Sequence, residues 1–175
     1  MLKKNDIILR AMEPEDVEVL YKWENDKELW HLSSTTKPFS RYQLEQYVLN
    51  AHLDIYELKQ MRLMISVKAD KEVCTIGCID LYDFDAVNKR AGVGILIAEN
   101  WRQKGVATLA LHALIDHVRQ FLDLHQLYCS IIEDNISSQK VFEKTGFKKT
   151  GKRLCWTRKG QEWKNDFFYQ LIFNS

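Results

Sequence analysis

The sequence predicts an α/β fold whose first half is mostly antiparallel sheet. Strand-like and helix-like runs alternate along all 175 residues, which is typical of mixed folds. The apolar runs 63–67, 73–81 and 92–98 follow one another with only polar turns between them, as in antiparallel neighbours. Two later strand-like runs, 127–132 and 163–173, are separated by a helical pattern. We therefore expect a mixed, mostly antiparallel sheet with helices.

Length and composition fit one domain spanning residues 1–175. The net charge of +1 gives no basic field, so we expect neither a nucleic-acid nor a membrane partner. No apolar run approaches the ~20 residues of a membrane span, and the first residues lack the core of a signal peptide. The four cysteines lack metal-site spacing. These observations predict a cytoplasmic protein with reduced thiols and no metal.

The first 60 residues read as a strand, a helix, a loop and a second helix. Ile7–Arg10 is strand-like, and Glu13–Asp16 begins a helix with proline in its first turn. Residues 33–38 have the composition of a loop. Ser40–Gln43 forms a capping box, and the helical period of the apolar residues then continues to Leu58.

A hairpin with an acidic end follows. Residues 63–67 and 73–81 read as its strands and Asp70–Glu72 as its turn. Asp80, Asp83 and Asp85 crowd the end of the second strand. Residues three apart on a strand point to opposite faces, so Asp80 and Asp83 face one pocket only if a bulge intervenes.

The stretch Arg102–Ala107 is a strand-to-helix turn. The β-branched run 92–98 precedes it, and the residues that follow have a helical apolar period, made by Ala107, Leu111, Leu114, Ile115, Val118 and Leu122. Backbone N–H groups at the start of a helix, next to cationic side chains, form a receptor for phosphate. Gly105 permits close approach of a ligand to the backbone.

A second motif, Asn135-Ile-Ser-Ser138 followed by Glu143-Lys-Thr-Gly146-Phe147, comes after the next strand. Together with Arg102-x-x-Gly105-x-Ala107, it resembles the GNAT acetyltransferases, and within them the ribosomal-protein N-terminal acetyltransferases and the polyamine N-acetyltransferases. The opening Arg10…Asp16 is also similar to the start of many such chains. The resemblance runs from Ile7 to Phe173 and implies the GNAT fold, with helices on both faces of the sheet.

This resemblance implies that acetyl-CoA is the co-substrate. The backbone of Ile95, Leu96 and Ile97 would pair with its pantetheine arm. Its pyrophosphate would lie on a loop made of Arg102, Gln103, Lys104, Gly105, Val106, Ala107 and Thr108. Asn135 matches the family asparagine that bonds the pantetheine; it also suits a plain helix N-cap.

The chain departs from the family pattern at two catalytic positions. Phe142 stands where many relatives have a tyrosine general acid, and Gly92 stands where related chains often carry a glutamate. Ser138 is the nearest hydroxyl in the motif, and either it or a water would hydrogen-bond the CoA sulfur; alternatively it bonds only backbone. Asp80 is the first candidate for the base, ahead of Asp83.

The resemblance leaves the acceptor open among a polyamine, a protein N-terminus and another small amine. Glu24, Asp26 and Glu28 favour a cation, although such charges also suit a solvated helix face. Three aromatic residues either line the acceptor pocket or simply pack: Trp30, Phe39 and Tyr42. A basic patch is either a solvated hairpin or a contact for the CoA 3′-phosphate: Lys148, Lys149, Lys152 and Arg153.

The alternative function is a degenerate domain that binds acyl-CoA as a sensor without turnover, as the residues at positions 92 and 142 suggest. The apolar final strand, 167–173, either completes the sheet or pairs with another subunit. By analogy with the family we expect a possible homodimer.

Overall fold

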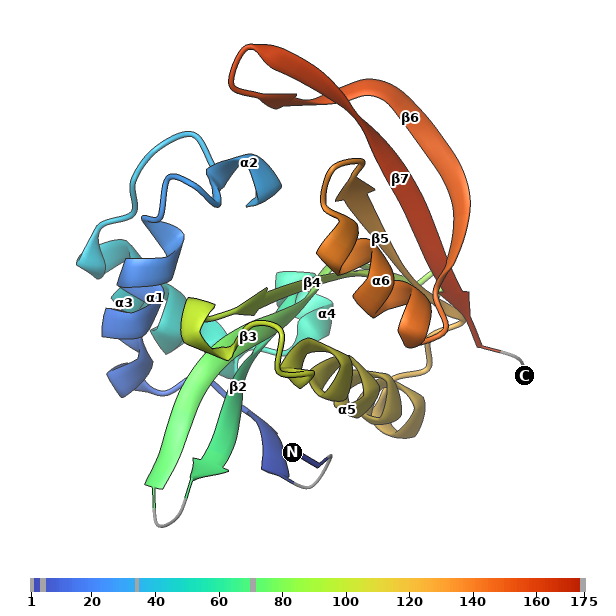
Figure 1. Cartoon of the computed structure of the whole chain (residues 1–175). Coiled ribbons are helices and arrows are strands. Elements are labelled where there is room, and N and C mark those ends of the chain that lie inside the picture. Colours follow the sequence, from blue (N-terminus) through green and yellow to red (C-terminus); the bar gives the residue numbers. More distant parts are fainter. Residues whose placement is uncertain (1, 4–5, 34, 70–71, 174–175) are drawn as a thin grey trace.

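A computed structural model describes residues 2–3, 6–33, 35–69 and 72–173. Its strands form one seven-stranded sheet in the order β1-β2-β3-β4-β5-β7-β6 (Figure 1). The strands are β1 (Ile7–Arg10), β2 (Met61–Ala69), β3 (Glu72–Asp85), β4 (Arg90–Ile97), β5 (Gln126–Ile132), β6 (Lys148–Lys159) and β7 (Glu162–Ile172). Every neighbouring pair is antiparallel except β4 and β5, which run parallel. The expected mixed, mostly antiparallel sheet is confirmed.

Six α-helices and three short 3₁₀ turns surround the sheet in the described part of the chain. The helices are α1 (Val17–Glu24), α2 (Trp30–Ser33), α3 (Arg41–Leu49), α4 (Ile55–Leu58), α5 (Val106–Phe121) and α6 (Ile136–Lys144). The 3₁₀ turns are η2 (Pro14–Asp16), η3 (Asn50–His52) and η4 (Glu99–Trp101). In Figure 1, α5 lies across one side of the sheet, and α1 and α3 lie together at the other side.

Alternation along the central strands divides the core between two faces. Met64 and Cys78 belong to a buried cluster with Leu20 of α1 and Leu44 of α3. Their strand neighbours, such as Ile79, belong to a second cluster that includes the apolar stripe of α5. Because side chains alternate along a strand, each face of the sheet is covered by its own helices. This arrangement matches the expected helices on both faces.

The second helix is shorter than its apolar period suggests. The capping box of Ser40 and Gln43 is confirmed, but α3 ends at Leu49 and η3 follows. Asp54 then caps a new helix, α4, by accepting hydrogen bonds from the N–H groups of Tyr56 and Glu57 at 2.8 and 3.0 Å. Asp54-x-x-Glu57 is a second capping box, and its local bonds interrupt the helix despite the apolar pattern.

The hairpin of β2 and β3 forms as expected, although its turn at residues 70–71 falls outside the described residues. β3 continues beyond Leu81 to Asp85 through a register shift between Tyr82 and Asp85, where Asp83 has φ 49°. The bulge that would bring Asp80 and Asp83 to one face is therefore present.

The apolar final strand completes the sheet of its own chain. β7 pairs with β5 on one side and with β6 on the other, which leaves β6 as the edge strand. Among the described residues, no helix is long and apolar enough to cross a membrane, and no three His, Cys, Asp or Glu side chains gather as metal ligands would. All four cysteines are free.

Candidate active site

The parallel strands β4 and β5 pair over only a short stretch. Arg90–Gly92 lie beside Gln126–Tyr128, after which β4 continues with β3 and β5 continues with β7. The two strands therefore part, as Figure 1 shows. The space between Val93–Ile97 of β4 and Cys129–Ile132 of β5 is called the wedge below. Because Val93–Ile97 have no strand partner on this side in the described part of the chain, an extended chain with amide groups can pair with their backbone.

The loop that leads into α5 has backbone N–H groups beside the wedge that no side chain of the described residues caps. Gln103 and Gly105 both have positive φ, 60° and 79°. Gly105 is the N-cap, so no side chain caps this helix in the described structure, and a Cβ added there would meet nothing within 4 Å. The first N–H groups of α5 (those of Val106, Ala107 and Thr108) have no acceptor within the helix and lie at the positive end of its dipole. This geometry fits a pyrophosphate.

The two cations of this loop have partners within the chain. The Nε of Arg102 donates to the carbonyl oxygen of Ile97 at 3.0 Å, and the ammonium of Lys104 lies 5.0 Å from the centre of the Trp101 ring. Arg102 thus bonds the same strand end that was predicted to pair with the pantetheine arm. Its other guanidinium N–H groups make no hydrogen bond to the described residues and can bond an anion.

Asn135 caps α6. Its Oδ1 accepts from the N–H of Ser138 at 3.2 Å and from the hydroxyl of Ser137 at 3.0 Å. The side-chain NH₂ of Asn135 and the half-buried hydroxyl of Ser138 have no hydrogen-bond partner among the residues that the structure describes. Both groups can therefore bond a ligand in the wedge, while the Asn135 oxygen keeps its capping role.

Phe142 lies in the core. It is 3% exposed and meets Phe147 edge to face, with ring centres 5.0 Å apart. A ring in this position offers no proton donor. Of the two hydroxyls in the same helix, that of Ser137 bonds Asn135, whereas that of Ser138 has no hydrogen-bond partner among the described residues.

Gly92 lacks a side chain because the ring of Tyr82 fills that space. A Cβ on Gly92 would lie 2.3 Å from the Cε2 of Tyr82. Tyr82 also meets Tyr128 edge to face at 6.1 Å, and burial raises the pKa of its hydroxyl. A glutamate therefore has no room at this position.

Asp80 belongs to an ion-pair network that sequence reasoning missed. Arg62 donates to both oxygens of Asp80, at 2.7 and 3.0 Å, and to Glu24 of α1 at 2.5 Å. The side chains are 16% (Arg62), 25% (Asp80) and 21% (Glu24) exposed. Burial opposes the charge of Arg62, but the charge of Asp80 and its hydrogen bonds outweigh this effect and raise the pKa of Arg62. The three groups carry a net charge of −1.

This network faces the side of the sheet that α1 and α3 cover. Tyr47 of α3 lies over it, with the Arg62 guanidinium 5.5 Å from its ring centre, and burial raises the pKa of Tyr47 to about 12. Asp80 lies opposite Gly94 across β3 and β4, at the start of the wedge. Of the three acids predicted around α1, Glu24 joins the site, whereas Asp26 and Glu28 are exposed.

Asp83 does not join the network of Arg62, Asp80 and Glu24. It lines a hollow of about 470 Å³ with Asp85, Arg90, Gln126, Tyr128, Phe168 and Gln170. This hollow lies where β4 and β5 are still paired, and the wedge begins beyond it. Asp85 is bonded there by Asn88 and Arg90.

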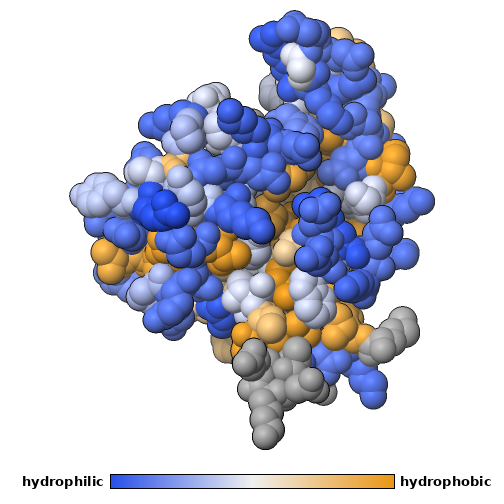
Figure 2. Space-filling model, turned by 60° about the vertical axis from the view of Figure 1, so that its left-hand side comes forward, coloured by the Kyte–Doolittle hydropathy of each residue, from blue (hydrophilic) through white to orange (hydrophobic). Residues whose placement is uncertain are grey.

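The aromatic trio does not act as one wall. Trp30 donates its indole N–H to the backbone oxygen of Glu24 at 2.9 Å and so ties α2 to the end of α1. Phe39 packs against the α1–α3 cluster, whereas Tyr42 is 68% exposed. Figure 2, with the α1–α3 side turned forward, shows apolar residues gathered between two mostly hydrophilic parts of the surface.

The expected basic patch is divided by the alternation of β6. Lys149 and Lys152 lie over the ring of Phe167 at 3.8 and 5.9 Å. Arg153 points to the other face, where it donates to the hydroxyl of Ser130 of β5. The four residues therefore do not form one surface.

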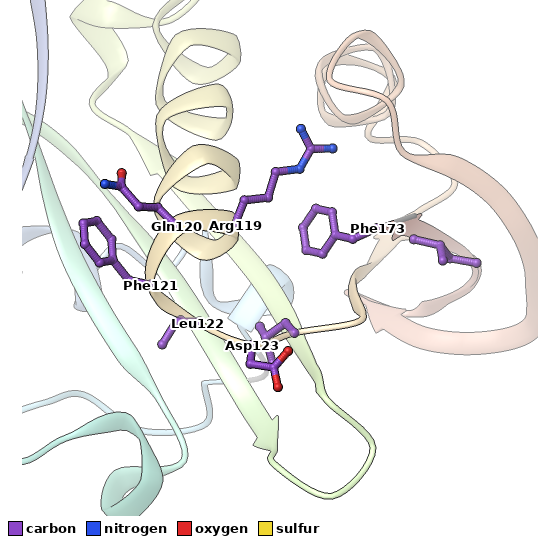
Figure 3. A pocket seen from close by; sticks show the side chains of 8 residues that line it. Arg119, Gln120, Phe121, Leu122, Asp123 and Phe173 are labelled. Atoms are coloured by element: carbon purple, nitrogen blue, oxygen red, sulfur yellow. The ribbon is translucent and has the colours of Figure 1, made fainter. Parts of the chain in front are cut away.

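Another hollow, of about 660 Å³, lies at the end of α5 that is far from the wedge. Figure 3 shows Arg119 and Phe173 pointing toward one another across it, and the guanidinium is 5.1 Å from the ring centre. Because it lies at the C-terminal end of α5, it is separate from the bare N–H groups of the wedge.

Comparison with known proteins agrees with this geometry. Residues 6–148 match the acetyltransferase (GNAT) domain family. The chain is 22% identical to a spermidine N(1)-acetyltransferase of Vibrio cholerae, over 84% of this chain and 82% of that protein. It is 30% identical to the N-acetyltransferase p20 of Bacillus licheniformis, over 83% of this chain and 80% of that protein.

Among solved structures, spermidine N-acetyltransferase from Vibrio cholerae in complex with CoA and spermine superimposes with a TM-score of 0.84, at 20% identity and 96% coverage of both chains. That likeness concerns the fold, whereas the family match covers most of the sequence. The chain therefore belongs to the GNAT acetyltransferase family and is an N-acetyltransferase that uses acetyl-CoA as its co-substrate.

Proposed function

We propose that the protein moves the acetyl group of acetyl-CoA to a primary amine by direct attack in a ternary complex, with residues 1–175 acting as one catalytic domain. The observation that carries this proposal is the wedge, a strand edge without a partner beside the bare N-terminus of a 16-residue helix. A thioester supplies the activated acetyl group. The chain then has to align the two substrates, which is catalysis by positioning.

Three parts of the site would hold the co-substrate. The backbone of Ile95, Leu96 and Ile97 would pair with the pantetheine amides, and the Asn135 NH₂ would bond the same arm. The N–H groups from Gln103 to Thr108 would bind the pyrophosphate, with added charge from Arg102 and Lys104.

Ser138 is the proposed hydrogen-bond donor to the leaving sulfur, and the proton that the thiolate finally takes comes from water. In the reaction a C–N bond forms, the C–S bond breaks, and the sulfur that leaves needs a proton or a hydrogen bond. The Ser138 hydroxyl is half-buried, has no partner among the described residues and sits in the first turn of α6. A hydroxyl there can donate to the sulfur directly or through a water.

Asp80 is the proposed acceptor of the proton that the ammonium loses, through a water. Its carboxylate is held in place by two bonds from Arg62 and lies opposite Gly94, where the absence of a side chain leaves room. Gly94 is open enough that an added Cβ would meet Asp80 only at 3.9 Å. With Glu24, Asp80 gives this wall the negative charge that attracts an ammonium group.

The acceptor is a primary amine: a polyamine, a protein N-terminus or another small amine. The polyamine option is supported by the names of relatives, which include spermidine acetyltransferases of 22% identity. The net negative charge of the network of Arg62, Asp80 and Glu24 favours a cationic acceptor of any of these classes. We also propose that the protein assembles as a homodimer, and light scattering would test this.

The test is release of the CoA thiol from acetyl-CoA with a panel of amines. The panel holds spermidine, spermine, ethanolamine and peptides with free Ala or Ser N-termini. Amine-dependent thiol release above the rate of hydrolysis supports the proposal. CoA binding by calorimetry without release for any amine would instead support the alternative, a domain that senses acyl-CoA without turnover; the buried Phe142 is the observation that favours it.

A further inference from the structure

Among the residues that the structure describes, Arg153 has no anionic partner. Its Nε is buried and has no hydrogen-bond partner among the described residues, while its Nη2 donates to the uncharged hydroxyl of Ser130. Asp166 lies opposite it in the β6–β7 register, but one Asp166 oxygen accepts from Thr157 at 2.8 Å and no ion pair joins it to Arg153. A half-buried guanidinium in this state is stabilised when an anion binds.

Aromatic rings hold the guanidinium in place. It lies 4.6 Å from the ring centre of Trp156 and 5.8 Å from that of Phe168. Phe168 in turn stacks on Tyr128 at 5.5 Å, and Tyr128 meets Tyr82. This row of rings extends from Arg153 to Tyr82, whose ring fills the space beside Gly92. Arg153 therefore lies on the same side of the sheet as Asp80.

The strand register places Arg153 and Asp80 on facing walls of the wedge. Gly92 and Tyr128 are the last pair of β4 and β5. Two residues further, on the same face, lie Gly94 of β4 and Ser130 of β5. Asp80 is the β3 neighbour of Gly94, and Arg153 bonds Ser130. Beyond the branching point, one wall is therefore anionic and the other cationic.

A bulge in β6 exposes this cationic wall. Between Arg153 and Thr157 the register with β7 shifts, so that Leu154, Cys155 and Trp156 have no Cα partner. Cys155 has φ 47°, and its N–H is bonded by the Asn165 side chain at 3.0 Å. Such bulges re-aim side chains at functional sites. Trp156 is 57% exposed as a result, and its ring stands beside the guanidinium.

We propose that the acceptor amine carries a carboxylate or phosphate group, that Arg153 binds this group, and that Trp156 packs on the adjoining apolar part. The proposal rests on the function proposed above and narrows its acceptor class. The amine would point to the wall with Asp80 and Glu24, and the anionic group to Arg153. A polyamine has no group for Arg153, so it would be a poor acceptor.

The first experiment measures kcat/KM for matched acceptors that differ in the anionic group. L-Phenylalanine is compared with L-phenylalaninamide, and O-phosphoethanolamine with ethanolamine; spermidine is included. We expect one anionic member to exceed its neutral counterpart by about tenfold or more, the range of a hydrogen bond to a charged group. The two pairs distinguish a carboxylate from a phosphate.

The variants locate the effect. R153Q should lower kcat/KM for the preferred anionic acceptor about 10- to 100-fold and leave its neutral counterpart within about twofold. R153K keeps the positive charge but lacks the planar set of guanidinium N–H donors. Its kcat/KM for the anionic acceptor should therefore lie between those of R153Q and the wild type. R158Q is the matched control, because Arg158 is an exposed arginine of β6 that bonds the backbone of Gly160, and it should behave like the unchanged protein.

A wild-type enzyme that acetylates neutral amines or spermidine as well as the anionic acceptors would overturn this inference and leave the proposed function intact. Equal losses for both members of a pair in R153Q would overturn it too. If no amine is acetylated, the proposed function fails. Whether Arg153 binds an anionic group is then tested by direct binding measurements.

Binding is followed by tryptophan fluorescence of the protein with CoA, titrated with L-phenylalanine, L-phenylalaninamide and O-phosphoethanolamine. The inference requires a saturable change with an anionic compound that is lost in R153Q and reduced in W156F. No saturable change, or the same change with the amide, would contradict it.

Discussion

The guanidinium of Arg10 and the carboxylate of Asp16 face each other across two hydrogen bonds of 2.7 Å each. Arg10 also donates to Thr75 of β3 at 2.7 Å, and Asp16 accepts from the N–H of Glu13 at 2.8 Å. The pair thus fixes the start of α1 to the sheet. Because Glu24 lies at the other end of α1, the orientation of the anionic wall depends on this pair.

Asp16→Asn should destabilise the protein by about 3 kcal/mol at pH 7, since removing one partner of a buried pair leaves the other uncompensated. Asp16 has 4% of its side chain exposed. Burial opposes its ionisation, but the bonds from Arg10 and from the Glu13 N–H outweigh this effect and lower its pKa below the ordinary 3.8. The measurement is the free energy of unfolding in urea.

The pH dependence has a definite sign. A carboxyl whose pKa is lower in the folded state stabilises the fold at pH values above its unfolded pKa, and this contribution is lost as the pH falls through the folded pKa. The difference between wild type and D16N should therefore shrink below about pH 4. Glu18→Gln, which removes an exposed pair with Arg41, is the control and should change little. A D16N deficit that stays constant down to pH 2 would contradict the argument.

Gly92→Ala should disturb Tyr82 because the new Cβ would lie 2.3 Å from its ring. We expect a loss of about 1–3 kcal/mol in the free energy of unfolding, the usual effect of overpacking. Gly94→Ala is the matched control two residues along the same strand, where the new Cβ would make contacts only at 3.9 Å. Equal stabilities of the two variants would show that the ring of Tyr82 does not occupy that space.

Ser138→Ala should lower kcat for thiol release about 10- to 100-fold while KM for acetyl-CoA changes little, because a hydrogen bond to the sulfur strengthens as charge develops on it in the transition state. Ser137→Ala, which removes the hydroxyl that bonds Asn135 at 3.0 Å, is the control for disturbance of the helix cap. A loss of kcat in S137A as large as in S138A would assign the effect to the cap.

Most of the order of strands and helices could be predicted from the sequence because it depends on local patterns; the short helices α2 and α4 are exceptions. Alternation, the helical period and the capping box at Ser40 each operate within a few residues. The apolar period continues to Leu58 and predicts a single helix, whereas the capping box of Asp54 and Glu57 ends it and begins α4. That signal is local and was available in the sequence.

The site depends on contacts that no local pattern contains. Arg62 is 18 residues from Asp80 and 38 from Glu24 along the chain, so their network follows only from the register of β2 with β3 and the position of α1. Arg153 and Lys152 are adjacent in the sequence, but they point to opposite faces of the sheet because side chains alternate along a strand. Motifs with fixed spacing predict the strand-to-helix turn at Arg102–Ala107, which the structure has before α5, whereas the proposed acceptor walls come from three-dimensional assembly.

Gly105→Ala distinguishes the proposed cofactor-binding role of the loop before α5 from the effect of this loop on the stability of the protein. At φ 79° an alanine is strained, so the free energy of unfolding should fall by about 1 kcal/mol. The methyl group would also project into the open space where the pyrophosphate is proposed to bind, and KM for acetyl-CoA should rise about tenfold or more. Gly160→Ala is the matched control: Gly160 has φ 63°, and a Cβ there also meets nothing within 4 Å, but it lies in the turn between β6 and β7. Both variants should lose similar stability in urea, and only G105A should bind acetyl-CoA more weakly in calorimetry. Unchanged binding in G105A would remove the N-terminus of α5 from the cofactor site.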